Sequence, residues 1–262
     1  MRVALIFHVL FFFSVPLRAE EKRVLVWSTS EGRERLMTSS NNDFFALADQ
    51  FQPQINPLYC GIATSAIVLN AIRQEVGLAP SQSALEVKTP VAFGGKNIPF
   101  PAYSQLTLLD ERTDAIKLRS VIRLENITAE NTGDSSRFDP GLSLTQLAEV
   151  LALYKVDVDT HYADDLSDDG IQRFRATVKN VVADDQSFLI CNFYGKAIGQ
   201  TTGGHISPVA AYHKESDSLL VLDVAGHKNS WYWVDVPGLY SAMHAQDGNH
   251  HRGWLVVQEG ME

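Results

Sequence analysis

The sequence has 262 residues, of which 45% are hydrophobic and 20% are charged, and its formal net charge is −9. This composition is typical of a soluble globular protein with enough apolar residues for one large core. The acidic balance argues against a general affinity for nucleic acid, because phosphate backbones are bound by clustered Lys and Arg. Two cysteines, Cys60 and Cys191, are too few for a disulfide framework or a four-thiolate zinc site.

The N-terminus has the layout of a secretory signal peptide. A positively charged start precedes an apolar run over residues 3–15, and Ala19 is a small residue before a charged stretch. The run is shorter than the roughly 20 residues that a membrane-spanning helix needs. We therefore expect a signal peptide over 1–19, cleaved after Ala19. Residues 20–262 are then a single secreted or periplasmic domain with no stable membrane span.

The predicted elements change along the chain from helices to strands. Apolar residues at helical spacing predict the helices, and short runs rich in β-branched and aromatic residues predict the strands. In chain order we expect a helix or turn at 43–52, a buried central helix at 61–73, a loop at 92–103, a capped helix from Ser143 to Tyr154, a strand at 156–161, a helix at 167–182 and strands at 187–193, 206–212, 218–224, 231–234 and 253–258. Helices followed by strands with short polar turns predict an α+β fold with an antiparallel sheet.

Cys60 is the first candidate for chemistry, because it comes directly before the predicted buried helix. At that position the unpaired N–H groups and the positive end of the helix dipole favour a thiolate. Gln54 lies upstream between Pro53 and Pro57, where its amide and the Cys60 backbone N–H could both donate to an oxyanion. A lone cysteine is otherwise a small buried hydrophobe, which is our expectation for Cys191.

His205 and Asp223 are the candidate partners of Cys60. His205 begins one predicted strand, about 145 residues after the cysteine, and Asp223 ends the next strand. A turn centred between residues 214 and 215 places both side chains at the same end of this hairpin. An acid beside an imidazole fixes its tautomer, as a Cys–His nucleophilic pair requires. Cysteine on an early helix and histidine on a later sheet is the papain-like order.

Several separated segments resemble the phytochelatin synthase family. Its active-site segment is similar to QINPLYCG at 54–61 and VLNA at 68–71, and its His/Asp segment is similar to IGQTTGGHISP at 198–208 and LDVA at 222–225. Shorter matches at 31–32, 43–45 and 252–254 extend the resemblance over about residues 27–258. The resemblance implies a papain-like fold and cleavage of the Cys–Gly bond of glutathione.

The resemblance also implies a role for each site residue. Cys60 is the nucleophile, His205 is the base and acid, Asp223 orients the imidazole, and Gln54 donates to the oxyanion. The reaction passes through a γ-glutamylcysteinyl thioester; water then completes hydrolysis, whereas a second glutathione gives phytochelatin.

A late Asp/Arg pair of the family, which holds the γ-glutamyl end, resembles Asp247 and Arg252, although the spacing here is shorter. With Gly204, which directly precedes the histidine, these residues form the expected substrate-binding set. The α-ammonium and α-carboxylate of a γ-glutamyl group require one acid and one arginine.

Two departures from the family pattern favour hydrolysis, as in its short bacterial members. Gly226 and His227 stand where the family has an arginine after the Asp-Val-Ala segment, and the cysteine-rich C-terminal half of the plant enzymes is absent from this sequence. We expect no cofactor for hydrolysis and no resident metal site. Cadmium or zinc could act as metal–glutathione thiolate activators, in keeping with metal detoxification. A homodimer is left open.

Two other readings remain. The chain could be a general papain-like cysteine protease, in which case no γ-glutamyl pocket closes the cleft beyond Cys60. It could instead be a non-enzymatic metal-binding protein of the cell envelope, because His244, His250 and His251 cluster near the C-terminus.

Overall fold

The computed structural model describes residues 24–75, 86–88, 97–99, 103–122, 141–184 and 186–260. The predicted signal peptide lies outside these residues. Within the described ranges, no helix is both long enough and apolar enough to cross a bilayer.

The element order confirms the α+β prediction. The helices are α1 (Ser30–Thr38), α2 (Asn42–Asp49), α3 (Cys60–Glu75), α4 (Arg119–Ile122), α6 (Leu144–Ala152), α7 (Asp168–Val181) and α8 (Val236–Met243), with 3-10 turns at Thr113–Ala115 and Gly195–Ile198. The strands are β1 (Val24–Val26), β2 (Glu86–Lys88), β3 (Asn97–Pro99), β4 (Val156–Tyr162), β5 (Ser187–Tyr194), β6 (Gly204–His213), β7 (Ser218–Val221), β8 (Tyr232–Asp235), β9 (Gln246–Asp247), β10 (His250–His251) and β11 (Gly253–Glu259).

The predicted capping box is present at the start of α6, where Ser143 and Gln146 bond reciprocally. The loop prediction for 92–103 is wrong at β3, which pairs with β2, and the rest of that range up to residue 102 is outside the described residues. The strand prediction for 218–224 is too long, because β7 ends at Val221.

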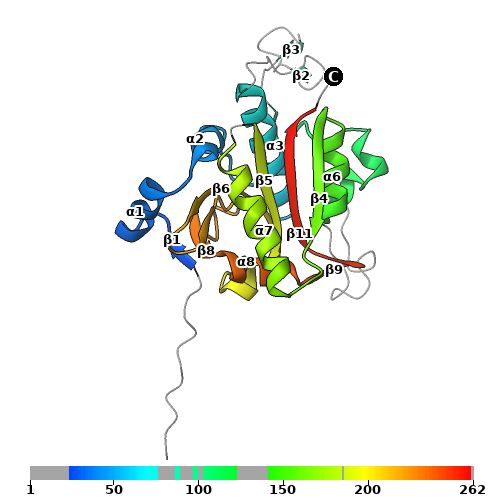
Figure 1. Cartoon of the computed structure of the whole chain (residues 1–262). Coiled ribbons are helices and arrows are strands. Elements are labelled where there is room, and N and C mark those ends of the chain that lie inside the picture. The colour runs from blue at the N-terminus through cyan, green and yellow to red at the C-terminus, as the bar shows by residue number, and fades with distance from the viewer. Residues whose placement is uncertain are drawn as a thin grey trace, which may run out of the picture.

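Seven strands form one antiparallel sheet in the order β1-β8-β7-β6-β5-β11-β4 (Figure 1). Successive side chains of β5 alternate between two hydrophobic cores, as the pleat of a strand requires. Phe188 and Ile190 face the core that includes α3 and α6, whereas Leu189, Cys191 and Phe193 face the core that includes α7 and α8. The sheet is therefore covered by helices on both faces, and Cys191 is fully buried, as predicted.

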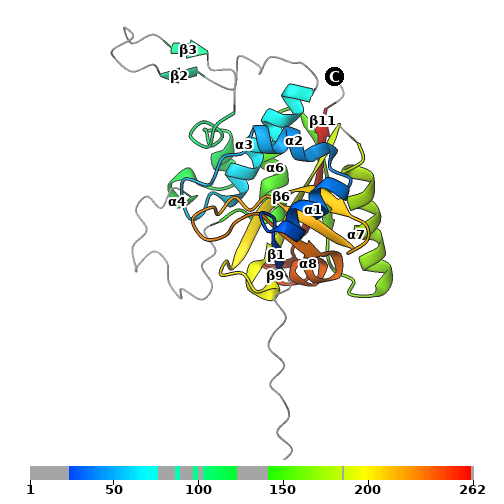
Figure 2. The same ribbon diagram turned by 90° about the vertical axis from the view of Figure 1, so that its left-hand side faces the viewer.

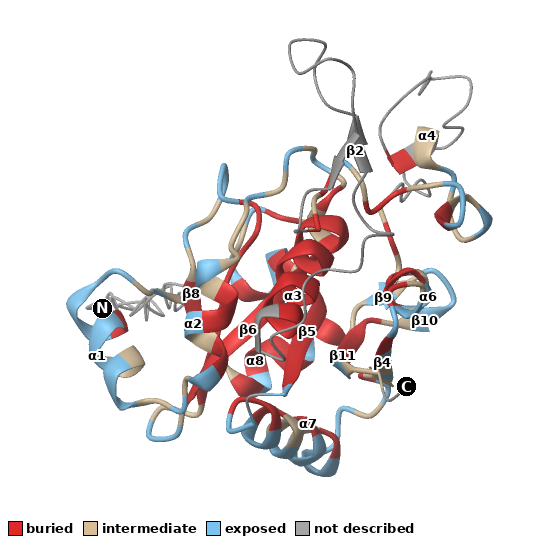
Figure 3. Cartoon of the chain, turned by 90° about the horizontal axis from the view of Figure 1, so that it is seen from above, coloured by how far each residue is buried: buried red, intermediate tan, exposed pale blue. Residues whose placement is uncertain are grey.

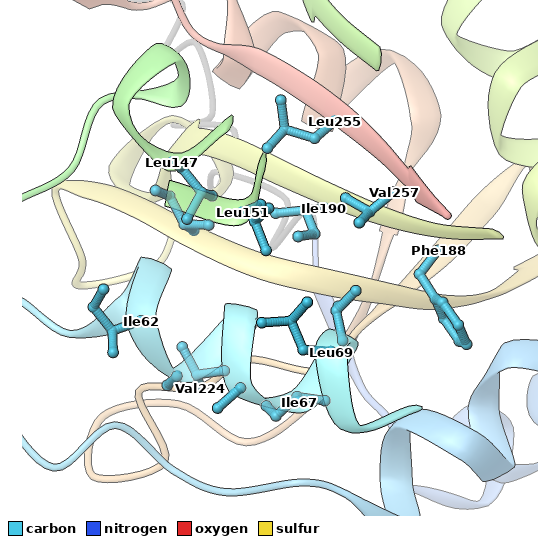
Figure 4. Packing of buried hydrophobic residues seen from close by; sticks show 14 of the residues in the cluster. Ile62, Ile67, Leu69, Leu147, Leu151, Phe188, Ile190, Val224, Leu255 and Val257 are labelled. Carbon is cyan, nitrogen blue, oxygen red and sulfur yellow. The ribbon is translucent and has the colours of Figure 1, made fainter. Parts of the chain in front are cut away.

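The central helix α3 is buried over residues 61–73 and runs through the interior of the molecule (Figure 3). Its side chains Ile62, Ile67 and Leu69 pack in the same cluster as Leu151 of α6 and Val257 of β11 (Figure 4). A helix that is apolar on all sides is stable only inside a core, and this burial fixes where its first residue, Cys60, lies.

Polar contacts hold α3 against the sheet at both ends. One turn after Cys60, the Thr64 hydroxyl donates to the backbone carbonyl of Ile206 on β6 at 3.2 Å. At the other end, Arg73 pairs with Glu259 of β11 at 2.6 Å. These contacts fix the position of the helix relative to the strand that begins with His205.

The β6–β7 hairpin moves the predicted turn centre by one residue, which shifts the cross-strand pairing by two residues. His213 pairs with Ser218, so the turn is centred between residues 215 and 216, and a bulge between Val209 and Ala211 shifts the register again. After β7 the chain leaves the ladder, and the backbone N–H of Leu222 bonds to the carbonyl of Pro208. The predicted outcome nevertheless holds, because His205 and Asp223 lie at the same end of the hairpin.

Candidate active site

Three of the predicted residues form one chain of contacts. His205 Nε2 lies 2.8 Å from Asp223 Oδ1, and the Cys60 side chain interacts with the imidazole and raises the pKa of His205. An ionised carboxylate can only accept, so Nε2 donates to Asp223 and Nδ1 is the nitrogen left for the sulfur. Cys60 at the start of α3, His205 at the start of β6 and Asp223 just after β7 thus bring a thiol, an imidazole and a carboxylate next to one another in that order.

Burial and charge set the protonation of this group. The side chains of His205 and Asp223 are 3% and 0% exposed. Burial lowers the pKa of His205, but the hydrogen bonds to Asp223 and Cys60 outweigh it, so the pKa lies well above the ordinary 6.5. Burial raises the pKa of the Asp223 carboxyl, but its hydrogen bond to His205 and the imidazolium charge leave that pKa below its usual value. The imidazolium form of His205 is therefore stabilised at neutral pH.

Two further side chains orient the pair, and the sequence analysis did not identify either of them. Ser207 Oγ lies 3.1 Å from His205 Nε2 and accepts from the backbone N–H of Val224. Asn229 Nδ2 donates to Asp223 Oδ2 at 2.9 Å. With the Ala225 backbone N–H on Oδ1, both carboxylate oxygens of Asp223 have partners.

Gln54 lies beside the Asp223 segment, because its backbone N–H donates to the carbonyl of Val224 at 2.9 Å. Its side-chain Nε2 donates to the carbonyls of Asn56 and Pro57, and Oε1 is buried without a partner among the described residues. Both amide hydrogens are thus directed at backbone carbonyls, so donation to an oxyanion requires one of these bonds to be exchanged. Gln105, a buried side chain absent from the sequence analysis, braces this loop by bonding to Gln52, Pro53 and Ile55.

The predicted substrate-binding residues gather at the same end of neighbouring strands. Phe193 of β5 pairs with His205 of β6, and the adjacent Asn192 pairs with Gly253 of β11. Arg252, which directly precedes β11, is thereby carried to the side of β5 opposite His205. Its Nη1 donates to Asn192 Oδ1 at 2.7 Å and lies 3.2 Å from Asp247 Oδ2.

Asn192 completes this network by donating to Asp247 Oδ2 at 2.9 Å. Arg252, Asp247 and Asn192 are all nearly or fully withdrawn from solvent, and Arg252 Nε has no partner in the described part of the chain. A buried charge pair with spare donors is typical of a site that recognises a charged group. The one sequence signal for Asn192 was its polar side chain within the apolar run 188–193.

Two glycines allow this arrangement. A Cβ at Gly204 would lie 2.8 Å from both Nη1 and Nη2 of Arg252, so only glycine lets the guanidinium rest against the residue before His205. Gly248 has φ +68°, which permits the tight turn between β9 and β10 directly after Asp247.

The histidines near the C-terminus do not form a metal cluster in the described residues, where no group of three or more His, Cys, Asp or Glu side chains could hold an ion. The rings of His244 and His251 stack with centroids 3.9 Å apart, and His161 stacks on Trp254.

Comparison with known proteins gives a consistent result over nearly the whole chain. The family model described as Phytochelatin synthase matches residues 18–254. Proteins named glutathione gamma-glutamylcysteinyltransferase are similar in Lotus japonicus (25% identity over 88% of this chain and 40% of the relative), in Schizosaccharomyces pombe (25%, 90% and 49%) and in Triticum aestivum (27%, 88% and 40%). The chain spans less than half the length of these relatives.

Proposed function

Because the chain belongs to the phytochelatin synthase family, we propose that it is a thiol enzyme that cleaves the Cys–Gly bond of glutathione or its conjugates. The observation that supports this most directly is the grouping of Cys60 with the hydrogen-bonded His205 and Asp223 beside a buried arginine–aspartate pair. The first group supplies a nucleophile with its proton donor, and the second supplies recognition of an amino acid head group.

The chemistry follows from the protonation of the site. The Cys60 thiolate attacks the cysteinyl carbonyl carbon. The oxyanion that forms accepts hydrogen bonds from the Cys60 backbone N–H and from a Gln54 side-chain N–H that has left the carbonyl of Asn56 or Pro57. The C–N bond breaks as His205 gives its proton to the leaving glycine amine, and a thioester remains. Water then attacks the thioester, His205 takes up its proton, and the C–S bond breaks to release γ-glutamylcysteine.

Recognition of the γ-glutamyl group is assigned to Arg252 and Asp247. The α-carboxylate accepts from the guanidinium, the α-ammonium donates to Asp247, and Asn192 holds both protein groups in place. Because Gly204 has no side chain, the Arg252 guanidinium lies against the backbone directly before His205. The side chains that bind the head group and the side chains that attack the carbonyl are thereby adjacent.

Hydrolysis is proposed as the main outcome, with phytochelatin synthesis as a minor one. Gly226 supplies no cation for a second glutathione, which supports water as the usual acceptor. Cadmium or zinc would act through a metal thiolate of glutathione, as a form of the substrate.

The test is to incubate the protein with reduced glutathione and to follow glycine and γ-glutamylcysteine by mass spectrometry. We expect equimolar release of both products and no release by Cys60→Ser. Adding cadmium and measuring γ-glutamylcysteine oligomers separates transfer from hydrolysis. If a folded sample with an alkylatable Cys60 releases no glycine, the proposal is wrong; cleavage of ordinary peptides instead would identify a general protease.

A further inference from the structure

A cavity of about 230 Å³ lies against the far side of Asp223 from the Arg252 network. Three aromatic side chains, Trp27, Phe51 and Trp231, line it, and its walls also include Asp223 and Asn229. Trp231 packs against Trp27 and Phe51 with ring centroids 5.3 and 4.9 Å away. The cavity therefore has a predominantly apolar lining directly behind a catalytic carboxylate.

The order of the strands places this cavity on one side of His205 and the arginine on the other. In the sheet order β8-β7-β6-β5-β11, His205 lies on β6, Asn192 on β5 and Arg252 before β11. Asp223 follows β7, Trp231 precedes β8, and Trp27 follows β1, which pairs with β8. For a substrate whose γ-glutamyl end is at Arg252 and whose scissile carbonyl is at Cys60, the leaving group is left with the Asp223 side of His205, the side on which the aromatic cavity lies.

Two adjoining loops contribute residues to the lining of the cavity. The loop before α3 and the loop after β7 lie side by side, joined by the Gln54 N–H to Val224 carbonyl bond (Figure 2). The first loop also includes Phe51 and the second also includes Gly226, an exposed residue whose added Cβ would approach Pro53 at 3.5 Å. Gly226 lines the cavity without a side chain, so a larger residue at this position would narrow it.

We propose that this cavity is the leaving-group subsite of the enzyme, and that it accepts an aromatic or large apolar residue in place of the C-terminal glycine. Its volume exceeds the roughly 150 Å³ of an apolar protein cavity that holds benzene, so a phenylalanine side chain fits. The favoured substrate class is therefore γ-Glu-Cys-X, where X is aromatic or branched. This inference depends on the proposed function and specifies its substrate.

The step is the same as for glutathione. The thiolate attacks the cysteinyl carbonyl, the bond to the nitrogen of X breaks, and His205 protonates the amine of X as it leaves. The aromatic cavity binds the side chain of X during this step. Among peptides with the same γ-glutamylcysteinyl group, kcat/KM therefore rises only with how well the side chain of X fits the cavity.

The experiment compares hydrolysis of γ-Glu-Cys-Phe, γ-Glu-Cys-Gly and γ-Glu-Cys-Glu by measuring γ-glutamylcysteine with mass spectrometry. We expect the ratio of kcat/KM for the Phe peptide over the Gly peptide to be about ten, which is the size of effect that apolar pockets give. The Glu peptide, which places a charge in the cavity, should be cleaved no faster than the Gly peptide.

Two variants locate the effect. Trp231→Ala removes one wall, and Gly226→Val narrows the opening without removing any aromatic ring, so each should bring the Phe/Gly ratio to about one. Phe45→Ala removes an aromatic side chain that is 70% exposed outside the cavity, and it should keep the wild-type ratio. The ratio is internal to each preparation, so a variant with reduced active fraction still gives a valid value.

The outcomes separate this inference from the proposed function. Cleavage of the Gly peptide with a wild-type Phe/Gly ratio of one or less overturns the leaving-group subsite and leaves the proposed function intact. A ratio of ten that survives both Trp231→Ala and Gly226→Val overturns the assignment to this cavity. Failure to cleave any of the three peptides rejects the proposed function, and the subsite with it.

Discussion

The two sides of His205 differ in how they can bind a ligand. On the side of β5 and β11, Arg252, Asp247 and Asn192 form a buried charged network with defined hydrogen bonds. On the side of β7 and β8, Trp27, Phe51 and Trp231 line an apolar cavity. A fixed hydrogen-bond network discriminates strongly against ligands that lack the matching groups, whereas an apolar pocket grades ligands by size. Under the two proposals above, one side defines which acyl group reacts and the other adjusts which amine leaves.

The largest expected effect comes from breaking the charged side. Arg252→Ala should lower kcat/KM for glutathione by about 10³-fold, because truncating a buried hydrogen-bonded charge costs about 2–5 kcal/mol. Steady-state kinetics measure this loss. Arg252→Lys should recover little of it, because an ammonium lacks the planar fork of a guanidinium. A loss of less than tenfold in a folded Arg252→Ala protein would show that the γ-glutamyl group binds elsewhere.

The second effect concerns Asp223, which lies between the two sides. Asp223→Asn should lower kcat by about 10²-fold or more, because an amide neither fixes the tautomer of His205 nor stabilises its charge. The raised pKa of His205 keeps its proton available above pH 6.5, and activity declines only as the pH rises through that raised pKa. The variant should therefore move the alkaline limb of the kcat/KM profile to lower pH.

The same linkage predicts a change in stability. The folded state holds the His205 proton more tightly than the unfolded state, so this stabilisation is complete below about pH 6.5 and is lost as the pH rises through the raised pKa. The difference in melting temperature between wild type and Asp223→Asn should thus shrink with increasing pH. A constant difference would mean that Asp223 stabilises the fold independently of the imidazolium.

A smaller effect is expected where the charged side meets the catalytic group. In Gly204→Ala the new methyl displaces the Arg252 guanidinium, which should raise KM for glutathione about tenfold, the size of a weakened charge-assisted hydrogen bond. The value of kcat should change less, because the His205–Asp223 contact is untouched. Separate determination of KM and kcat checks this; equal effects on both would place Gly204 in the chemical step instead.

The smallest effect is expected for Asn229→Ala. Loss of one of the hydrogen bonds to Asp223 should lower kcat about fivefold, since a single bond contributes about 1 kcal/mol. The alkaline limb should move in the same direction as in Asp223→Asn but by less, which a pH profile of the variant measures. An unchanged profile would show that Ala225 and His205 alone hold the carboxylate.

Patterning was sufficient for the parts of the fold that are apolar and regular. The helix at 61–73 and the strands at 187–193 and 253–258 were predictable because burial demands continuous or periodic apolar residues there. Helix α1 gave no such signal, since only Gly32 of its residues is buried. Helix α8 offered a usable signal, a capping Asp235 before Pro237, that the sequence analysis did not use.

The candidate site divides in the same way. Cys60, His205 and Asp223 could be predicted because each lies within two residues of the end of a regular element. Asn229 could not, because its contact depends on the path of the turn after Ala225, where the N–H groups of Lys228 and Asn229 bond to the Ala225 carbonyl. The orientation of Gln54 was also beyond sequence patterns, because its acceptors are backbone carbonyls in its own loop.

The ion pair between Arg73 and Glu259 has a consequence for how the site selects its acyl group. Cys60 and Arg73 lie near opposite ends of one helix, Arg252 directly precedes β11, and Glu259 ends it. The Arg73–Glu259 ion pair therefore closes a rigid frame of two packed elements. The span from the sulfur to the guanidinium is then set by secondary structure and not by loops. Under the proposed function such a frame fixes the distance between the glutamyl head group and the cysteinyl carbonyl. An α-linked glutamyl group has fewer bonds between these two points, so its cysteinyl carbonyl carbon would lie out of reach of the thiolate.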